Sequence, residues 1–243
     1  MRILRPAEGI YAFYDGRIEG YQALEKEGVR RFTVVLSHWH PDHVAGTAAF
    51  RDSEVIASDR TAELLARFGP AIERGEHEGP PGIDPLILPT RVFGDRLQLA
   101  IGQQQVELVH TNIHSDDATV LWLPGQRLLL CGDTMEDTIT YVDEPQSFGV
   151  HLANLERLRQ LDPARILPNH GDPDVIGGGY SKDLIRATEH EPAGADRGVV
   201  GGRSDPLLRA VRGGPSGERR NSARLWVEAS GPPAAAHYGA ASR

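Results

Sequence analysis

Residues 33–46 read TVVLSHWHPDHVAG, a short apolar run followed at once by four potential metal ligands. Residues 33–37 are β-branched or apolar apart from Ser37, which predicts a short buried strand. Pro41 cannot continue that strand, so the backbone must turn where the ligands lie. A strand that ends in such a cluster predicts a metal site at one edge of a sheet.

The four side chains of this segment divide into two pairs. His38 and His40 are two residues apart, so an extended backbone places both imidazoles on the same side. Asp42 and His43 lie beyond the turn and can face a second point in space. Only 10 of the 243 residues are histidine, and three of them fall within the six positions from 38 to 43. This concentration favours a site for two metal ions over a histidine-rich surface loop.

The composition is that of an ordinary globular protein, with 40% hydrophobic and 25% charged residues. The formal net charge of −8 argues against a nucleic-acid partner. The one cysteine, Cys131, excludes an internal disulfide framework. Residues 1–13 lack the apolar core of a secretory signal, and no run approaches membrane-spanning length. We therefore expect a cytoplasmic protein with a small-molecule substrate and no membrane partner. The sequence does not indicate an oligomeric state.

Apolar periodicity predicts strands that alternate with helices. Strands are expected at residues 9–14, 53–58, 91–99, 105–110, 119–123, 127–131 and 165–167. Helices are expected at residues 18–28, 44–50, 60–68, 152–161 and 181–189. Residues 69–89 are expected to form an irregular connection that shapes a substrate pocket. This order predicts an α/β fold, namely an αββα sandwich of two mixed β-sheets with helices on the outside.

The pattern H-x-H-x-D-H at residues 38–43, directly after a hydrophobic strand, resembles the signature of the metallo-β-lactamase superfamily. Three further segments resemble later motifs of that family in the expected order: Ile-His-Ser-Asp-Asp at 113–117, Cys-Gly-Asp-Thr at 131–134 and Leu-Pro-Asn-His-Gly at 167–171. The resemblance covers about residues 32–191. It implies the same αββα fold. Only 37 residues precede His38, so the resemblance also implies an abridged N-terminal sheet.

The resemblance implies seven metal ligands and two divalent ions. The ions would be zinc, with iron or manganese as alternatives, because imidazole and carboxylate groups suit these metals. Asp133 would bridge the two ions, and Asp42 and Asp133 would have catalytic roles. The complete expected ligand set is His38, His40, Asp42, His43, His114, Asp133 and His170.

Two alternatives concern neighbouring residues. His110 competes with His114 for the third histidine of the first site. We prefer His114 because the acidic pair and apolar strand after it match the family pattern. Cys131 invites a ligand interpretation, because some relatives bind zinc through cysteine. In those relatives the cysteine occupies the position held here by Asp133, so we expect Cys131 to be a buried core residue.

The function expected from this resemblance is that of a metal-dependent hydrolase, in which a dimetal-bound hydroxide attacks the carbonyl of an ester, thioester, lactone or amide. The absence of a G-x-S-x-G motif weakens a serine-hydrolase interpretation. An alternative from another class is a metal-binding but catalytically impaired protein of the same fold, because the N-terminal sheet is expected to be abridged. A redox di-iron role is a third alternative, and it would require a flavin domain.

Composition changes near residue 192. Residues 192–243 contain 8 Arg, no Lys and 4 acidic residues, and they are dominated by Gly, Ala, Pro, Ser and Arg. Their few apolar residues cannot offset the entropy of ordering a chain. We expect a working domain at residues 1–191 and a disordered tail at 192–243, with a reading-frame change after His190 as a sharper hypothesis.

Overall fold

The structure is a computed structural model, and it describes residues 2–7, 10–14, 32–77, 82–137, 140, 145–190 and 223–227. The expected helix at residues 18–28 lies outside the described residues. So does most of the expected tail. Of the helices in the described part, none combines the length and the apolar character that a membrane span needs.

The largest sheet has five strands in the order β10-β9-β8-β7-β6. Its strands are β6 (Arg96–Ile101), β7 (Gln104–His110), β8 (Thr119–Leu123), β9 (Leu128–Gly132) and β10 (Arg165–Pro168). The four strands from β6 to β9 pair antiparallel, whereas β10 joins β9 in parallel. The sheet is therefore mixed. The short helix η2 (Pro124–Gln126) connects β8 to β9.

A second sheet contains β3 (Thr33–Val35), β4 (Glu54–Ser58) and β5 (Arg91–Phe93), all parallel. The short helices α2 (Pro41–Val44) and η1 (Thr47–Phe50) connect β3 to β4. The long helix α3 (Asp59–Glu73) follows β4, and the Ser58 hydroxyl caps it by accepting from the Thr61 N–H. A buried apolar cluster joins this sheet to α2 and α3, and it includes Val44, Val55 and Leu65.

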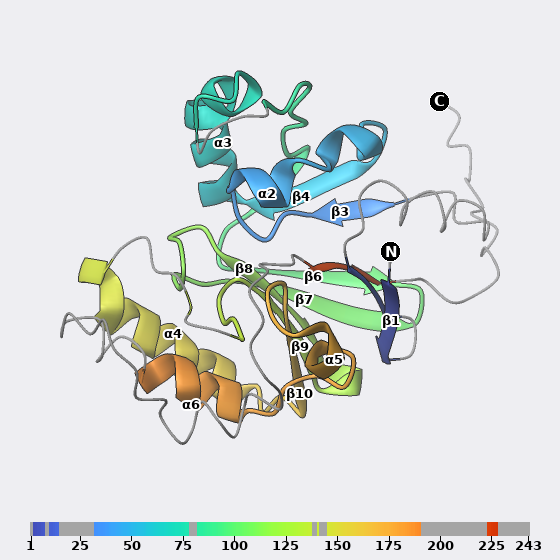
Figure 1. The fold of residues 1–243 in the computed structure, drawn as a ribbon, viewed down its shortest axis with the longest axis vertical. Helices are drawn as coiled ribbons and strands as arrows, with labels where there is room; N and C mark the ends of the chain where they lie inside the picture. Colours follow the sequence, from blue (N-terminus) through green and yellow to red (C-terminus); the bar gives the residue numbers. More distant parts are fainter. Residues whose placement is uncertain are drawn as a thin grey trace, which may run out of the picture.

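The remaining helices in the described part are η3 (Pro145–Ser147), α4 (Phe148–Gln160), α5 (Pro173–Ile176) and α6 (Asp183–His190). Figure 1 shows α4 and α6 side by side, across the five-stranded sheet from α3, whereas the short α5 lies apart from them near β9 and β10. The main core cluster joins Leu155 of α4 and Ile185 of α6 to Leu129 of β9, and it also reaches Ile56 of β4. The layers therefore run helix, sheet, sheet, helix, which confirms the predicted αββα sandwich.

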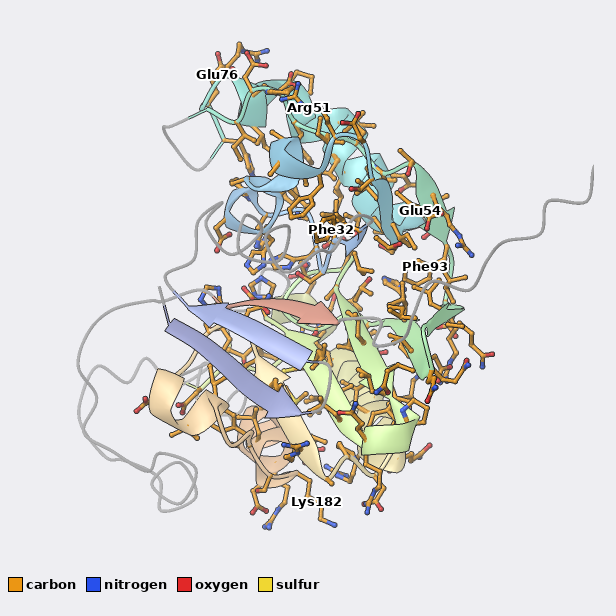
Figure 2. The ribbon with its side chains drawn as sticks, turned by 90° about the vertical axis from the view of Figure 1, so that its right-hand side faces the viewer. Phe32, Arg51, Glu54, Glu76, Phe93 and Lys182 are labelled. Carbon is orange, nitrogen blue, oxygen red and sulfur yellow. The ribbon has the colours of Figure 1, made fainter. Side chains whose placement is uncertain are left out.

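The side chains fill the space between these layers. Figure 2 shows Arg51 and Glu76 at the outer surface of the α3 layer, and Lys182 at the opposite end of the molecule. Phe93, which is 6% exposed, belongs to the main core cluster between the sheets. Apolar burial in two separate clusters, rather than one, stabilises the sandwich.

The expected strand at residues 91–99 is in fact two strands. β5 pairs with β4 of the second sheet, whereas β6 pairs with β7 of the five-stranded sheet. The chain passes from one sheet to the other at Gly94 and Asp95, where the Asp95 carbonyl accepts from the His110 N–H. A continuous apolar pattern cannot show such a change, because both strands face the same core.

Two helices also differ from expectation. α3 continues through Pro70 to Glu73 rather than ending at Phe68, because Leu65 and Ile72 both bury against the same cluster. The irregular connection is therefore shorter than residues 69–89. α4 begins at Phe148 rather than at Leu152, and Leu152 is 43% exposed. The buried face is instead His151, Asn154, Leu155 and Leu158, as a period of 3.6 residues requires.

A third, smaller sheet has the order β1-β2-β11 and is antiparallel throughout. Its strands are β1 (Arg2–Ala7), β2 (Ile10–Tyr14) and β11 (Ala223–Val227). The sequence does not predict β1, and residues 223–227, which are expected to lie in a disordered tail, form a strand in the structure. The apolar, β-forming residues Leu225, Trp226 and Val227 pair along β2, which otherwise forms only a hairpin of marginal stability. The domain boundary at residue 192 stays a prediction.

Candidate metal centre

The expected ligands converge from the ends of four strands. His38 and His40 follow β3, and α2 then contributes Asp42 and His43. His114, Asp133 and His170 follow β7, β9 and β10 respectively. β3 belongs to the sheet that also contains β4 and β5, whereas β7, β9 and β10 belong to the five-stranded sheet. The site therefore lies where the edges of these two sheets meet. The structure brings all seven side chains together in groups that could hold metal ions.

Three imidazoles form the first cluster, which we call the histidine cluster: His38, His40 and His114. The Nε2 atoms of His38 and His114 are 3.2 Å apart. Each lies 3.1 Å from the Nδ1 atom of His40. All three side chains are buried, with exposed fractions of 1%, 8% and 4%. Three nitrogen atoms thus point at one small volume from which water is largely excluded.

The second cluster, which we call the mixed cluster, contains Asp42, His43 and His170. The Asp42 Oδ2 atom lies 3.2 Å from the His43 Nε2 atom and 3.7 Å from the His170 Nε2 atom. This cluster is more open, because the Asp42 side chain is 54% exposed. It combines one carboxylate with two imidazoles at the mouth of the site.

Asp133 lies between the two clusters. Its Oδ2 atom is 3.0 Å from the His43 Nε2 atom and 3.1 Å from the His170 Nε2 atom. The same oxygen is 3.9 Å from the Nε2 atoms of both His38 and His114. Asp133 is itself only 5% exposed. One oxygen of this buried carboxylate therefore faces four ring nitrogens, two from each cluster.

Ser37 orients a histidine in each cluster. Its hydroxyl lies 3.1 Å from the Nδ1 atom of His38 and 3.4 Å from the Nδ1 atom of His43. The side-chain amide of Asn169 is a further partner for His43 Nδ1, at 3.3 Å. These contacts leave both Nε2 atoms facing the centre. Partners of this kind fix the tautomer and the ring orientation of metal-binding histidines.

Backbone geometry explains two residues of the motifs. Gly132 ends β9 with a φ of +57°, and a Cβ there would lie 3.2 Å from the Ser37 Cβ atom. Glycine at this position allows β9 to approach Ser37 closely and to direct Asp133 toward the site. His114 has a φ of 72°, which is uncommon for a residue with a side chain. Such left-handed conformations occur preferentially at functional sites.

The electrostatics of the two clusters differ. Burial and the neighbouring His43 lower the pKa of His38 well below 6.5, so this imidazole is neutral near pH 7. Burial acts in the same direction on His43, but the charge of Asp133 outweighs it and raises the pKa of His43 to about 10. Burial acts to raise the pKa of Asp133, but the charge of His43 holds it well below its usual range.

The donor set fits divalent metal ions. Tetrahedral zinc with bonds of about 2.0–2.1 Å to nitrogen has ligand nitrogens about 3.3 Å apart, close to the spacings of the histidine cluster. The buried Asp133 Oδ1 atom has no hydrogen-bond partner among the described residues. A bound cation would satisfy this atom, whereas its isolation is otherwise costly. Neutral imidazoles and carboxylates are the expected ligands for such ions.

The competing candidates are placed elsewhere. The His110 Nε2 atom lies 2.8 Å from the Asp116 carbonyl oxygen, which stabilises the loop that carries His114. Cys131 is fully buried, and its thiol points at the carbonyl oxygens of Met135 and Leu167 at 3.5 Å. Burial raises the pKa of this thiol. The prediction that Cys131 is a buried core residue is confirmed.

Several residues around the site are not predicted from the sequence. Ser37 and Asn169 each adjoin a predicted ligand, so a polar side chain beside a motif histidine was an available signal. Glu136 groups with His114 and Asp133, all with ligand atoms within 4.8 Å of one another. Asp137 and Tyr180 form a hydrogen bond near His170. No local pattern marks these last three residues.

Comparison with known proteins agrees with this geometry. A family described as "Metallo-beta-lactamase superfamily" matches residues 20–170, which include all seven clustered residues. The chain belongs to this superfamily. A solved metallo-beta-lactamase from Pontibacter korlensis superposes with a TM-score of 0.60 over 79% of this chain and 98% of that chain. At 19% sequence identity, that likeness shows the shared fold alone.

Two relatives of this superfamily protein carry the names of hydrolases. A linear primary-alkylsulfatase of a Pseudomonas species is 25% identical over an alignment of 194 residues. The match covers 64% of this chain and 37% of the relative. A hydroxyacylglutathione hydrolase of Albidiferax ferrireducens is 33% identical over 117 residues, 47% of this chain and 38% of the relative. The chain thus spans less than two fifths of either relative. Family and site together support a metal-dependent hydrolase in general terms.

Proposed function

We propose that this superfamily member is a hydrolase that uses two divalent metal ions to cleave a carbonyl ester, thioester, lactone or amide. Zinc is the metal that we propose first. The central position of Asp133 is the observation that carries this proposal, since its Oδ2 atom is within 3.9 Å of nitrogens from both clusters. Such an arrangement suits a carboxylate shared by two ions. When bound, the ions would lower the pKa of water at the site and so supply a nucleophile near pH 7.

The protein's own residues then have distinct roles. The histidine cluster and Asp133 hold their groups in a buried, rigid arrangement. Asp42, at the open side, can accept the proton released during hydrolysis, because its carboxylate is ionised near pH 7 and is 54% exposed. Burial raises the pKa of Asp42, but the hydrogen bond and the charge of His43 outweigh burial. Proton transfer by a placed carboxylate contributes about 10²–10⁴-fold in enzymes.

The relatives suggest which substrates to test. One is named for a hydroxyacylglutathione and the other for linear alkyl sulfates. A sulfate ester is therefore a second candidate, because the alkylsulfatase aligns with the larger share of this chain. An alkyl sulfate belongs in the panel beside an ester, a thioester, a lactone and an amide.

The test combines metal analysis with that panel. We expect about two transition-metal ions per chain and turnover of at least one carbonyl substrate. His170→Ala should retain about one ion and lose nearly all turnover, because it removes one ligand of the mixed cluster. His110→Gln is the matched control, since its amide nitrogen can reach the Asp116 carbonyl as the imidazole does.

Three outcomes would contradict the proposal in different ways. Full turnover by metal-free protein would exclude metal-dependent hydrolysis. Two bound ions without turnover of any panel member would favour the catalytically impaired alternative. Cleavage of the alkyl sulfate alone would replace the carbonyl substrate by a sulfate ester.

A further inference from the structure

The loops after β9 and β10 together decide the geometry of the mixed cluster. β9 and β10 are parallel neighbours, so both loops leave the sheet at the same edge. The first loop carries Asp133 and the second carries His170, and the Asp133 Oδ2 and His170 Nε2 atoms are 3.1 Å apart. The position of His170 therefore depends on how one loop is held against the other.

At its Nδ1 atom, His170 lacks a hydrogen bond of the kind that orients His38 and His43. Ser37 lies beside the Nδ1 atoms of His38 and His43. Among the described residues, by contrast, no hydrogen-bond partner lies at the buried Nδ1 atom of His170. A metal-binding histidine normally donates through its second ring nitrogen, which fixes its orientation. His170 must therefore be positioned mainly through its backbone.

Asp137 holds the backbone directly after His170, at the two peptide groups that flank Gly171. Its N–H donates to the His170 carbonyl oxygen at 3.2 Å. Its Oδ2 atom accepts from the Asp172 N–H at 3.2 Å and from the Tyr180 hydroxyl. Asp137 lies four residues after Asp133, so these bonds connect the loop of the central carboxylate directly to the loop of His170.

Tyr180 fixes the other end of this connection. Its backbone pairs with Ile166 in β10 through two hydrogen bonds of 2.8 Å, and its side chain is only 3% exposed. Gly171 passes between the partners, because a Cβ there would lie 2.9 Å from the Asp137 Cβ atom and 3.0 Å from the Tyr180 hydroxyl. The contact is thus close-packed, and it leaves little freedom to the loop at His170.

We propose that Asp137 and Tyr180 are positioning residues that hold His170 against Asp133 and so set the affinity of the mixed cluster for its metal ion. This inference rests on the proposed two-metal function. Neither side chain belongs to the groups of described residues that could hold a metal ion. They act through the backbone of the loop, in the manner of the partners that tune metal affinity from outside the ligand set.

The experiment is a titration of metal-free protein with Co²⁺, followed by its visible absorption. Tyr180→Phe removes only the hydroxyl, and Asp137→Ala removes the acceptor. We expect either change to weaken one of two binding steps by about 10–100-fold and to leave the other step unchanged. The weakened step should be the one lost in His170→Ala. Asp137→Asn keeps an acceptor oxygen and should restore most of the affinity.

Asp162→Asn is the matched control at the opposite end of the same strand pair. Asp162 precedes β10 and pairs with Arg127, which precedes β9. Asparagine tolerates the left-handed φ of 52° at this position. Both Co²⁺ steps should stay unchanged in this variant. Thermal unfolding of each metal-free variant shows whether the fold persists. If Asp137→Ala does not fold, Tyr180→Phe still provides the test, because it keeps the aromatic ring in the core.

Unchanged affinities in a folded Tyr180→Phe protein would overturn the inference. Equal weakening of both steps, or weakening in Asp162→Asn as well, would also overturn it, because the effect would then be a general loss of stability. A single Co²⁺ step in the unsubstituted protein would instead overturn the proposed two-metal function on which the inference rests.

Discussion

The histidine cluster and the mixed cluster share one carboxylate but differ in burial and in charge. The histidine cluster is dry, with no side chain more than 8% exposed, and burial keeps the pKa of His38 low. In the mixed cluster, Asp42 is 54% exposed and His170 is 16% exposed. There Asp133 outweighs burial and raises the pKa of both His43 and His170. The first cluster is thus ready to accept an ion, whereas the second holds protons that an ion must displace.

This difference suggests a division of labour within one site. A buried, neutral set of ligands favours tight and permanent binding, because nothing must be removed first. An open set with an exposed carboxylate favours exchange of protons and access of substrate. Asp133 is the group through which one cluster can influence the other.

Asp133→Asn should weaken both clusters together. The substitution removes the negative charge and one oxygen donor that faces nitrogens of each cluster. We expect total bound metal to fall well below one ion per chain, and hydrolysis to fall by more than about 100-fold, since even partners outside the ligand set cost 10–100-fold. Metal analysis after dialysis measures the first effect. Loss of one ion only would place Asp133 in a single cluster and remove the basis of the comparison.

The ligand candidates could be found in the sequence because they lie in short motifs. His38, His40, Asp42 and His43 fall within six residues, and a strand followed by a proline-containing turn explains their approach. The structure brings these and the three later candidates together. Their role as metal ligands stays a prediction. The αββα fold was equally accessible, since alternating strands and helices favour layered α/β architectures.

Features that depend on contacts between distant segments could not be found in this way. The bond between Asp137 and Tyr180 joins residues 43 positions apart. The change of sheet at Gly94 is invisible because β5 and β6 share one apolar pattern. The helix expected to end at Phe68 continues to Glu73, because burial of Ile72 extends α3 beyond that point. In each case tertiary packing outweighs a local preference.

Binding to the two clusters should release different numbers of protons. The pKa of His43 is raised to about 10, so in the metal-free protein this group stays protonated at pH 7–8 and must lose its proton when an ion binds. His38, with its lowered pKa, is already deprotonated. Apparent affinity at the mixed cluster should therefore rise with pH by about tenfold per unit for each proton released, and level off near the pKa of His43.

Calorimetry in buffers of different ionisation enthalpy measures this release. The unsubstituted protein should release at least about one proton more than His170→Ala, which retains only the histidine cluster in our proposal. The raised pKa of His43 also predicts how the stability of the metal-free protein depends on pH. Because the folded pKa of His43 exceeds its usual 6.5, its stabilising contribution is complete below pH 6.5 and disappears as the pH rises toward 10. Equal proton release by the two proteins would contradict the assignment of charge to the mixed cluster.

Cys131→Ser should have the smallest effect on the site, because Cys131 belongs to the core rather than to either cluster. Its thiol is 3.5 Å from the carbonyl oxygens of Met135 and Leu167, and a shorter hydroxyl side chain would lie farther from both. A buried hydroxyl without a good partner should lower the free energy of unfolding by about 1–3 kcal/mol. Denaturant unfolding measures this cost, with Cys131→Ala as the control that removes the polar atom. Metal content should be unchanged in both variants. If Cys131→Ser loses metal while Asp133→Asn keeps it, then the cysteine, two residues before Asp133, is the shared ligand, and the comparison of the two clusters must be rebuilt around it.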